Sequence, residues 1–535
     1  MSLAQSSVPG SRTSSAAKST TIPDLVKIGT IPTNTAIDVE TSILEPVSFS
    51  QSQCHFVLAN KGILHSNSRI TFSTEGDFGT LTAGASPGYA TFPPGVGVHS
   101  LISRCRLAVG GKTVSEIEDF AHWMGYESTF ISNETNKERE QVLNSRVINL
   151  SPNLSERGEA AGQDYDGAGV GANNLESVTE ALTVGLDNGT DFQYSDSRFL
   201  FLNQLRLPLK DEVIKATRDA HDFQKDVNKP IFSILLADLF PFLKMNQLPL
   251  FMMKEQVSVT LTFTPKSVPD AAAGQVNSSR LVPLGTITAA AVDTDVDIDR
   301  TNVKMIADYI YYPQDLMAQY AAANSTMGFT YVDYQFVKRT VVRDDAADPK
   351  INEFAAQLIQ NLGGAGRIVN KVVIQTSRDL AGGSDRPQTL SLLGPFESDG
   401  PAVSTTTAGS VTTNLRYNDL FLYPIDVSNA ARHFHNVMTA EGRMPMVSRD
   451  LYSGQGQLTT GAAEPTFMRY SGDSSIRSKF FYTAYRLNRN ERVNSRGIEL
   501  YDQRTTMATT TTLRAWLQVV RQAQLRDGIM EVSYA

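Results

Sequence analysis

The segment KEQVSVTLTFTP, at residues 254–265, constrains the fold of this chain more than any other stretch. Its side chains alternate strictly, with Val257, Val259, Leu261 and Phe263 on one face and Gln256, Ser258, Thr260 and Thr262 on the other. A period of two is typical of a strand that has one buried and one solvated face. Because strands of parallel sheets are buried on both faces, this pattern predicts an antiparallel sheet.

Comparable runs recur along the chain, namely SRITFST, RFLFLNQLRLPL, NVKMIADYIYY, TYVDYQFVKRTVV, IVNKVVIQT and LRAWLQVV. The chain has 535 residues, of which 41% are hydrophobic, so it can bury a substantial core. β-Sandwiches often reach ~200–250 residues each. Two large β units therefore fit this length as well as three or four smaller domains.

Predicted helices are few and short. One is TVSEIEDFAHWM, and the residues that would share its apolar face are Ile117, Phe120, Ala121 and Met124. Thr113 and Glu116 would form its capping box, after a Gly-Gly turn that separates it from the preceding strand. LRYNDLFLYPIDVSNAARHFHNVM repeats this order, with a strand through Leu420, a turn at Pro424 and a helix that opens at Ser428. One such plan in each half of the chain indicates a duplicated unit.

Three segments lack these patterns. Residues 1–35 are rich in Ser, Thr, Ala and Pro, and such a segment cannot bury enough apolar area to offset the entropy of ordering it. We expect a flexible N-terminal arm there. Polar loops occupy 132–196 and 377–411, and loops of this length are uncommon in compact domains unless they are functional or disordered. Each half is thus predicted to be a rigid β scaffold with long surface insertions.

Charge and composition exclude several classes of protein. The net charge of −8 and the pI near 5.5 argue against a nucleic-acid coat, which needs a concentrated basic surface. The first twenty residues lack an apolar signal core, so secretion is not expected. IFSILLADLFPFL is interrupted by Asp238 and Pro241 and is shorter than the ~20 apolar residues of a membrane span. With only Cys54 and Cys105, the chain has no disulfide framework, which favours a reducing compartment.

RLAVGGKT, at residues 106–113, matches the end of a phosphate-binding P-loop. That signature also needs a glycine five positions before Gly111, where this chain has Arg106. The preceding LISRCRLAV alternates polar and apolar residues, whereas the strand that feeds a P-loop is buried on both faces. We therefore interpret Gly110–Thr113 as a structural turn that binds no nucleotide.

The remaining candidates for chemistry also have simpler interpretations. His433 and His435 are two apart, so on a helix they point in different directions and cannot share a metal. VDTDVDIDR places Asp293, Asp295, Asp297 and Asp299 on one face of a strand, which is a possible Ca²⁺ site but more typical of a solvated acidic strand. The glycine clusters at 167–171 and 363–367 lack the strand–loop–helix context of a dinucleotide site. We predict no catalytic, cofactor-binding or metal-binding residues, no cofactor and no enzymatic activity.

Several segments, in order from about residue 98 to the C-terminus, resemble one family. They are GVHSLISRCRLAVGGKTVSEIEDF, LADLFPFLKMNQLPLFMMKEQVSVTLTF, IADYIYYPQDLMAQYA, LRYNDLFLYPIDVSNAARHFH and RAWLQVVRQAQLRDGIMEVSYA. Together they resemble the double jelly-roll major capsid proteins of eukaryotic double-stranded DNA viruses, especially those of the polinton-like virus and virophage branch. Proteins of the large nucleocytoplasmic DNA viruses are more distant, because this chain has Tyr312, Pro313, Gln314 and Asp315 where they tend to carry Leu-Asp and a Glu-Arg-Arg group.

The resemblance implies an all-β fold of two antiparallel eight-stranded jelly rolls with short helices and long loop insertions. It divides the chain into an arm at 1–35, a first jelly roll at 36–312, a linker helix at 313–325 and a second jelly roll at 326–535. It also implies a homotrimeric, pseudo-hexagonal capsomer in an icosahedral virion that is assembled inside the host cell. The implied partners are neighbouring capsomers and penton and minor capsid proteins, without sequence-specific nucleic-acid binding or a transmembrane segment.

Two alternatives remain open. The same fold could serve as a transient scaffold of immature virions. A carbohydrate-binding or carbohydrate-active β-sandwich would need paired carboxylates and exposed aromatic platforms, whereas the only tryptophans, Trp123 and Trp516, both lie in apolar patterns.

Overall fold

A computed structural model describes the chain over residues 37–76, 89–92, 96–127, 206–207, 231–265, 282–284, 296–341, 358–378, 411–427, 430–442, 482–487, 491–504 and 511–534, together with residues 139, 143 and 144. The arm at 1–35, nearly all of the loop at 132–196 and most of 377–411 lie outside this part of the chain. Within the described residues, no helix is long and apolar enough to span a bilayer.

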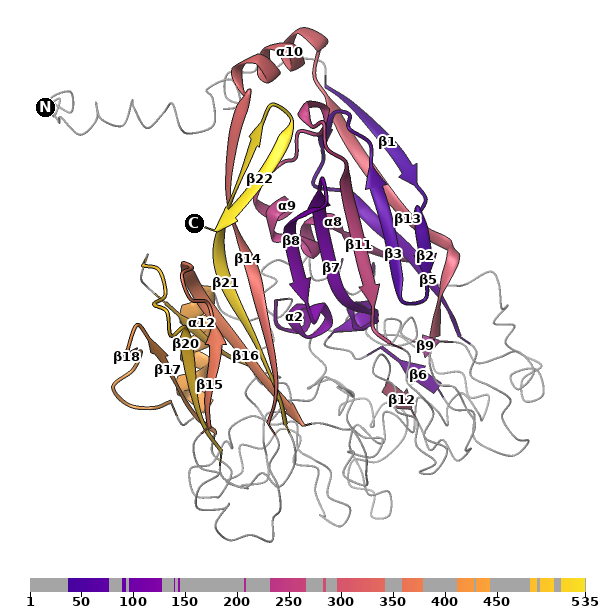
Figure 1. Cartoon of the computed structure of the whole chain (residues 1–535). Coiled ribbons are helices and arrows are strands. Elements are labelled where there is room, and N and C mark those ends of the chain that lie inside the picture. Colours follow the sequence, from indigo (N-terminus) through magenta and orange to yellow (C-terminus); the bar gives the residue numbers. More distant parts are fainter. Residues whose placement is uncertain are drawn as a thin grey trace, which may run out of the picture.

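Two five-stranded antiparallel sheets are formed by residues 38–311 (Figure 1). One has the order β1-β13-β5-β10, with β4 also paired to β13, and the other has the order β2-β3-β11-β7-β8. Their strands are β1 (Asp38–Leu44), β2 (Ser48–Ser50), β3 (Gln53–Leu58), β4 (Ile63–Leu64), β5 (Arg69–Gly76), β7 (Ile102–Val109), β8 (Lys112–Glu118), β10 (Ile231–Leu235), β11 (Val257–Phe263) and β13 (Val296–Tyr311). A small third sheet contains β6 (Tyr89–Thr91), β9 (Arg206–Leu207) and β12 (Val282–Leu284).

Two further antiparallel sheets are formed by residues 326–534. Their orders are β14-β21-β16-β19, with β22 paired to β21, and β15-β20-β17-β18. The strands are β14 (Thr326–Val341), β15 (Leu358–Gly363), β16 (Val369–Arg378), β17 (Val411–Tyr417), β18 (Leu420–Phe421), β19 (Thr483–Arg486), β20 (Ile498–Arg504), β21 (Thr511–Arg526) and β22 (Ile529–Tyr534).

The strand order identifies the fold. If β1, β3, β5, β7, β8, β10, β11 and β13 are lettered B to I in chain order, the two sheets read B-I-D-G and C-H-E-F. Lettering β14 to β21 in the same way gives the same two orders. This interleaving, in which the first strand pairs with the last, defines a jelly roll. The chain is therefore an all-β protein with two antiparallel jelly rolls, which confirms the predicted fold class.

The helices are short and lie between strands. They are α2 (Phe120–Glu127), α8 (Leu236–Leu239), α9 (Pro241–Met245), α10 (Gln314–Ala323) and α12 (Ala430–Glu441), with 3₁₀ turns η3 (Gly97–Leu101) and η5 (Leu250–Met252). In each jelly roll a helix follows strand F, because α2 comes after β8 and α12 comes after β18. α10 connects β13 to β14 and lies at one end of the molecule (Figure 1).

The predicted helix from Thr113 is wrong in its first half. Gly110 and Gly111 have φ values of 55° and 81°, so they form a two-residue hairpin that returns β8 antiparallel to β7. The Thr113 hydroxyl accepts a hydrogen bond from Arg106 Nε at 2.8 Å and caps no helix. The helix begins only at Phe120. In the second jelly roll, Asn418 and Asp419, with φ values of 48° and 67°, form the equivalent hairpin between β17 and β18.

The alternating segment KEQVSVTLTFTP forms β11, at the centre of the first jelly roll. β11 pairs with β3 on one side and β7 on the other, so it has no free edge. The four apolar residues of its inner face are buried, with exposed fractions between 0% and 3%. The Phe263 ring lies 6.4 Å from that of Phe49, between the centroids. The prediction for this strand is confirmed.

We expect Phe263→Ala to lower the free energy of unfolding by about 3–5 kcal/mol, because the buried ring would leave a cavity that the sandwich cannot fill. Chemical denaturation of the purified protein measures this change. Thr262→Ala, on the opposite face of the same strand, is the matched control and should cost much less. A loss well under 1 kcal/mol for Phe263→Ala would place that ring outside the core.

Candidate functional site

The most elaborate polar and aromatic arrangement in the described chain is the junction between the two jelly rolls. There β14, β21 and β22 of the second jelly roll run beside β8 and α9 of the first (Figure 1). A single cluster of buried apolar residues crosses this boundary and includes Trp123 and Val114 from the first jelly roll and Trp516 and Leu525 from the second. A separate cluster fills the interior of the second jelly roll.

Among the described strands, β8 is the edge strand of its sheet, so one side of its backbone has no strand partner there. Side chains of the second jelly roll bond these backbone groups instead. The Tyr331 hydroxyl donates to Val114 O at 2.6 Å, and Trp516 Nε1 donates to Glu118 O at 3.0 Å. Arg521 donates to Thr113 O at 3.1 Å and to Val114 O at 3.2 Å. The exposed edge that could otherwise pair with another chain is thereby closed.

Arg521 and Asp333 form a buried ion pair at the centre of this contact. Arg521 Nη1 lies 2.6 Å from Asp333 Oδ2, and the two side chains are 12% and 5% exposed. Asp333 also accepts hydrogen bonds of 3.2 Å from the Ser115 hydroxyl and from the backbone N–H of Glu116. Burial raises the pKa of Asp333 to about 6, although Arg521 favours its charged form. Each charge therefore depends on the other to remain inside the protein.

A second polar group lies where β8 leads into α2. Arg514 Nε lies 2.7 Å from Asp119 Oδ2, and His122 Nδ1 lies 2.6 Å from Asp119 Oδ1. Burial alone would raise the pKa of Asp119, but His122 and Arg514 together hold it well below its usual range. Asp119 has a φ of 51°, a left-handed conformation that non-glycine residues rarely adopt. The bonds to Arg514 and His122 hold the chain in this bend, which ends β8 and starts α2.

Aromatic rings from both jelly rolls pack together next to these polar groups. The Trp123 ring, from α2, lies 4.1 Å from the Tyr334 ring and 5.9 Å from the Trp516 ring, between centroids. The centroids of the Tyr126 and Tyr482 rings are 5.3 Å apart. Both tryptophans are buried, as their apolar sequence context predicted, so neither is a surface platform for a sugar.

A third charged group ties α12 and β16 to α2. Lys371 Nζ lies 2.6 Å from Glu441 Oε1, and both side chains are under 10% exposed. The Tyr126 hydroxyl donates to the same carboxylate oxygen at 2.5 Å. Because Glu441 belongs to the second jelly roll and Tyr126 to the first, this bond also crosses the junction.

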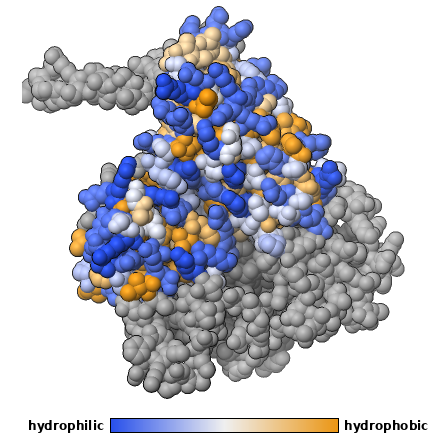
Figure 2. Space-filling view, viewed as in Figure 1, coloured by the Kyte–Doolittle hydropathy of each residue, from blue (hydrophilic) through white to orange (hydrophobic). Residues whose placement is uncertain are grey.

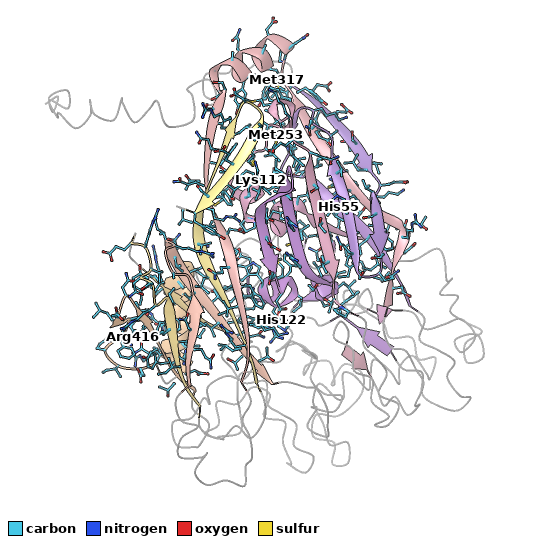
Figure 3. All side chains as sticks on the ribbon, viewed as in Figure 1. His55, Lys112, His122, Met253, Met317 and Arg416 are labelled. Atoms are coloured by element: carbon cyan, nitrogen blue, oxygen red, sulfur yellow. The ribbon has the colours of Figure 1, made fainter. Side chains whose placement is uncertain are left out.

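Lys112, the residue that suggested a P-loop, belongs to this junction (Figure 3). Its ammonium group donates to Met530 O in β22 at 2.9 Å and lies 3.5 Å from Glu255 Oε1. Glu255 in turn accepts a 2.9 Å hydrogen bond from the backbone N–H of Met530. Arg106 bonds Thr113 and Gly111 O across the hairpin. Lys112 therefore holds the C-terminal hairpin to the first jelly roll instead of facing an open loop.

The other sequence candidates are dispersed. His433 is buried in α12 with Nδ1 3.1 Å from Thr483 Oγ1, whereas His435 is exposed, so the two do not converge. Gly363, Gly364 and Gly366 lie at and just after the end of β15, before β16, with positive φ. The cluster at 167–171 lies outside the described residues. No group of three or more potential metal ligands occurs in the described part of the chain.

The interpretation of VDTDVDIDR as a solvated acidic strand is wrong at Asp299. This residue is buried and accepts hydrogen bonds from Asn302 Nδ2 at 2.7 Å and from the backbone N–H of Thr301 at 2.9 Å. Burial would raise its pKa, but these bonds hold it below the usual range. Asp299 lies opposite Ser73 of β5 and also accepts a 3.2 Å hydrogen bond from its hydroxyl, and the pairing of the two strands shifts between Asp299 and Lys304. Asp293 and Asp295 lie outside the described residues.

Sequence reasoning missed the charged residues of the junction. These residues are Asp333, Arg514 and Arg521, and each is a charged residue within an apolar or alternating strand. Such a charge was the one sequence feature that could have indicated a buried ion pair. Nothing in the sequence places Asp333 beside Arg521, because the two positions are brought together only by the pairing of β14 with β21.

Comparison with known proteins gives similarity at the level of structure only. No protein-family model and no curated protein sequence matches the chain. A cryo-EM structure of the Sputnik virophage matches with a TM-score of 0.49 and 11% identity, covering 94% of this chain and 90% of that one. The crystal structure of the mavirus major capsid protein matches with a TM-score of 0.47 and 11% identity, covering 94% and 91%. A quasi-atomic structure of the PBCV-1 virus capsid matches with a TM-score of 0.47 and 10% identity, covering 94% and 98%. The fold assignment depends on the strand order, not on these values.

We expect Arg521→Met to lower the free energy of unfolding at pH 7 by about 3–5 kcal/mol, because it leaves the Asp333 carboxylate buried without its partner. The penalty should shrink between pH 7 and pH 5. The pKa of Asp333 in the folded protein is above its usual value, so protonation in this range favours the folded state, and more so without Arg521.

Urea denaturation at both pH values measures this difference. Arg496→Met, which removes an exposed arginine paired with Asp419, is the control and should change little at either pH. A penalty for Arg521→Met that stays constant or grows at pH 5 would contradict the role of Asp333.

We expect no retention of ATP with Mg²⁺ in equilibrium dialysis, because Lys112 is engaged by Met530 and Glu255 and Arg106 occupies the position of the P-loop glycine. Lys112→Ala should instead loosen the C-terminal hairpin, which hydrogen exchange at 529–534 would detect. A micromolar affinity for ATP that Lys112→Ala abolishes would overturn this interpretation.

Proposed function

We propose that the protein is a major capsid protein that assembles into an icosahedral viral shell. The observation that carries this proposal is the presence of two jelly rolls with the same strand order, held side by side by a buried junction. A pair of similar β-sandwiches held in one arrangement suits a shell, because many copies of the chain can pack side by side in a repeated way. The Sputnik, mavirus and PBCV-1 structures are described as virus or capsid structures, which agrees with this role.

The proposed units are an arm at 1–35, a first jelly roll at 36–312, a linker helix at 313–325 and a second jelly roll at 326–535. Three such chains contribute six sandwiches and give a pseudo-hexagonal capsomer, since the two jelly rolls of a chain are alike in strand order. Neighbouring capsomers, penton proteins and minor capsid proteins are the further partners of this proposal. The protein would act in the virion after assembly inside the host cell, without enzymatic activity.

The loop at 132–196 belongs to the connection between strands F and G of the first jelly roll. We assign it to the outer surface of the capsomer, where contact between copies would offset the cost of ordering a long polar segment. The alternative of a carbohydrate-binding sandwich loses its support, because Trp123 and Trp516 are committed to the junction.

We expect the purified protein to be a trimer with three times the chain mass of 58.5 kDa, which multi-angle light scattering measures. Negative-stain images of the same sample should show pseudo-hexagonal particles. Hydrogen exchange at 132–196 should be slower in the trimer than in a monomer obtained by dilution. A stable monomer that never enters particles would refute the capsid role.

A further inference from the structure

Each jelly roll has two surfaces that matter for side-by-side packing. One is the pair formed by strands B and I, and the other is the free edge of strand F. Within the chain, the B–I pair of the second jelly roll (β14 and β21) packs against the F edge of the first (β8). Among the described elements, this leaves one surface of each kind without such a contact, namely the B–I pair of the first jelly roll (β1 and β13) and the F edge of the second (β18).

The unmatched B–I pair carries apolar residues on its outward face. Val39 and Ile43 of β1 are 51% and 65% exposed. In the register of the sheet they lie opposite Ile310 and Ile306 of β13, which are half-buried. We call these four residues the β1 patch. Within the described part of the chain, β1 pairs with β13 alone, so it is also the edge strand of its sheet.

The unmatched F edge is also apolar. β17 is the one described strand that pairs with β18, and Leu420 and Phe421 are 58% and 52% exposed. Ile425, four residues after Phe421, is 70% exposed. We call these three residues the β18 patch. Figure 2 shows hydrophobic surface at both places, at the right over β1 and at the lower left over the sheet that contains β18.

Exposed apolar residues are concentrated in these two areas. Twelve large hydrophobic residues of the described chain are substantially exposed, and seven of them lie in the β1 patch, in the β18 patch or at Ile37 and Val47 beside β1. In the equivalent surfaces of the junction, by contrast, Tyr331, Trp516 and Val114 are buried. The junction residues are buried because the other jelly roll packs against them, whereas the residues of the two patches have no jelly roll against them in the described chain.

The two patches cannot meet within one chain, because β1 and β18 lie on opposite sides of the molecule (Figure 1). We propose that the β18 patch of one copy docks onto the β1 patch of the next, so that the contact between copies repeats the junction within the chain. This inference rests on the proposed capsomer. Such a contact joins two different surfaces, so every chain uses both patches and the assembly closes into a ring when the rotation permits.

Two single variants test the proposal. Ile43→Lys places a charge in the β1 patch, and Leu420→Glu places one in the β18 patch. Each should shift the protein from trimer to monomer in light scattering, while far-UV circular dichroism and the melting temperature stay close to those of the unaltered protein. Met245→Lys changes a residue of α9 that is 56% exposed and lies outside both patches, so it should leave the trimer intact.

A mixture of the two single variants identifies the pairing. Ile43→Lys retains an intact β18 patch and Leu420→Glu retains an intact β1 patch, so the two chains can form one native contact but cannot close a ring. We expect a species of two chains in the mixture and only monomers in each variant alone.

Three outcomes would overturn the proposal. If both variants remain trimeric, the copies associate through other surfaces, and the capsid role survives. If only Ile43→Lys dissociates, the occupant of the β1 patch is another segment, such as a strand added to its free edge. If both variants dissociate but their mixture does not associate, the patches do not contact each other. A failure of the capsid role itself differs from all of these, because the unaltered protein would then be monomeric.

Discussion

The closure of the β8 edge by side chains of the second jelly roll is the interaction on which the arrangement of the chain depends. A sheet edge presents backbone groups that will pair with any available strand. Here Tyr331, Arg521 and Trp516 bond to these groups, and the Arg521–Asp333 pair makes the contact specific, since neither charge is stable in that position alone. The junction therefore holds the two sandwiches together through a shared apolar cluster and directional polar contacts.

The same constraint explains the composition of the strands at the junction. β21 contributes Leu517 and Val519 to the interior of the second jelly roll and Trp516 and Leu525 to the cluster shared with the first. A strand with two covered faces loses the simple alternation of β11, which has one solvated face. The segment LRAWLQVV thus differs from KEQVSVTLTFTP because its sheet lies between two cores.

The buried junction fits the proposed role, in which the protein holds two sandwiches in a defined arrangement. Within one chain, the B–I pair of the second sandwich packs against the F edge of the first. The B–I pair of the first sandwich and the F edge of the second stay exposed. The proposed capsomer uses those remaining surfaces between copies. Under this proposal, a B–I pair packs against an F edge both within a chain and between chains. Three chains then give six similar contacts around a ring, which has an approximately sixfold shape.

The sequence by itself determined the all-β class, the buried face of β11 and the rejection of the P-loop, because these depend on local alternation and on single residues such as Arg106. It also indicated a repeated strand–turn–helix plan, although it placed Thr113 to Glu118 in the helix. Only tertiary structure decided that this segment is a strand, since the Gly110–Gly111 hairpin brings it back onto β7. The Asp333–Arg521 pair and the position of Asp299 opposite Ser73 were likewise set by strand register, which joins positions separated by many residues and leaves no local signal in the sequence.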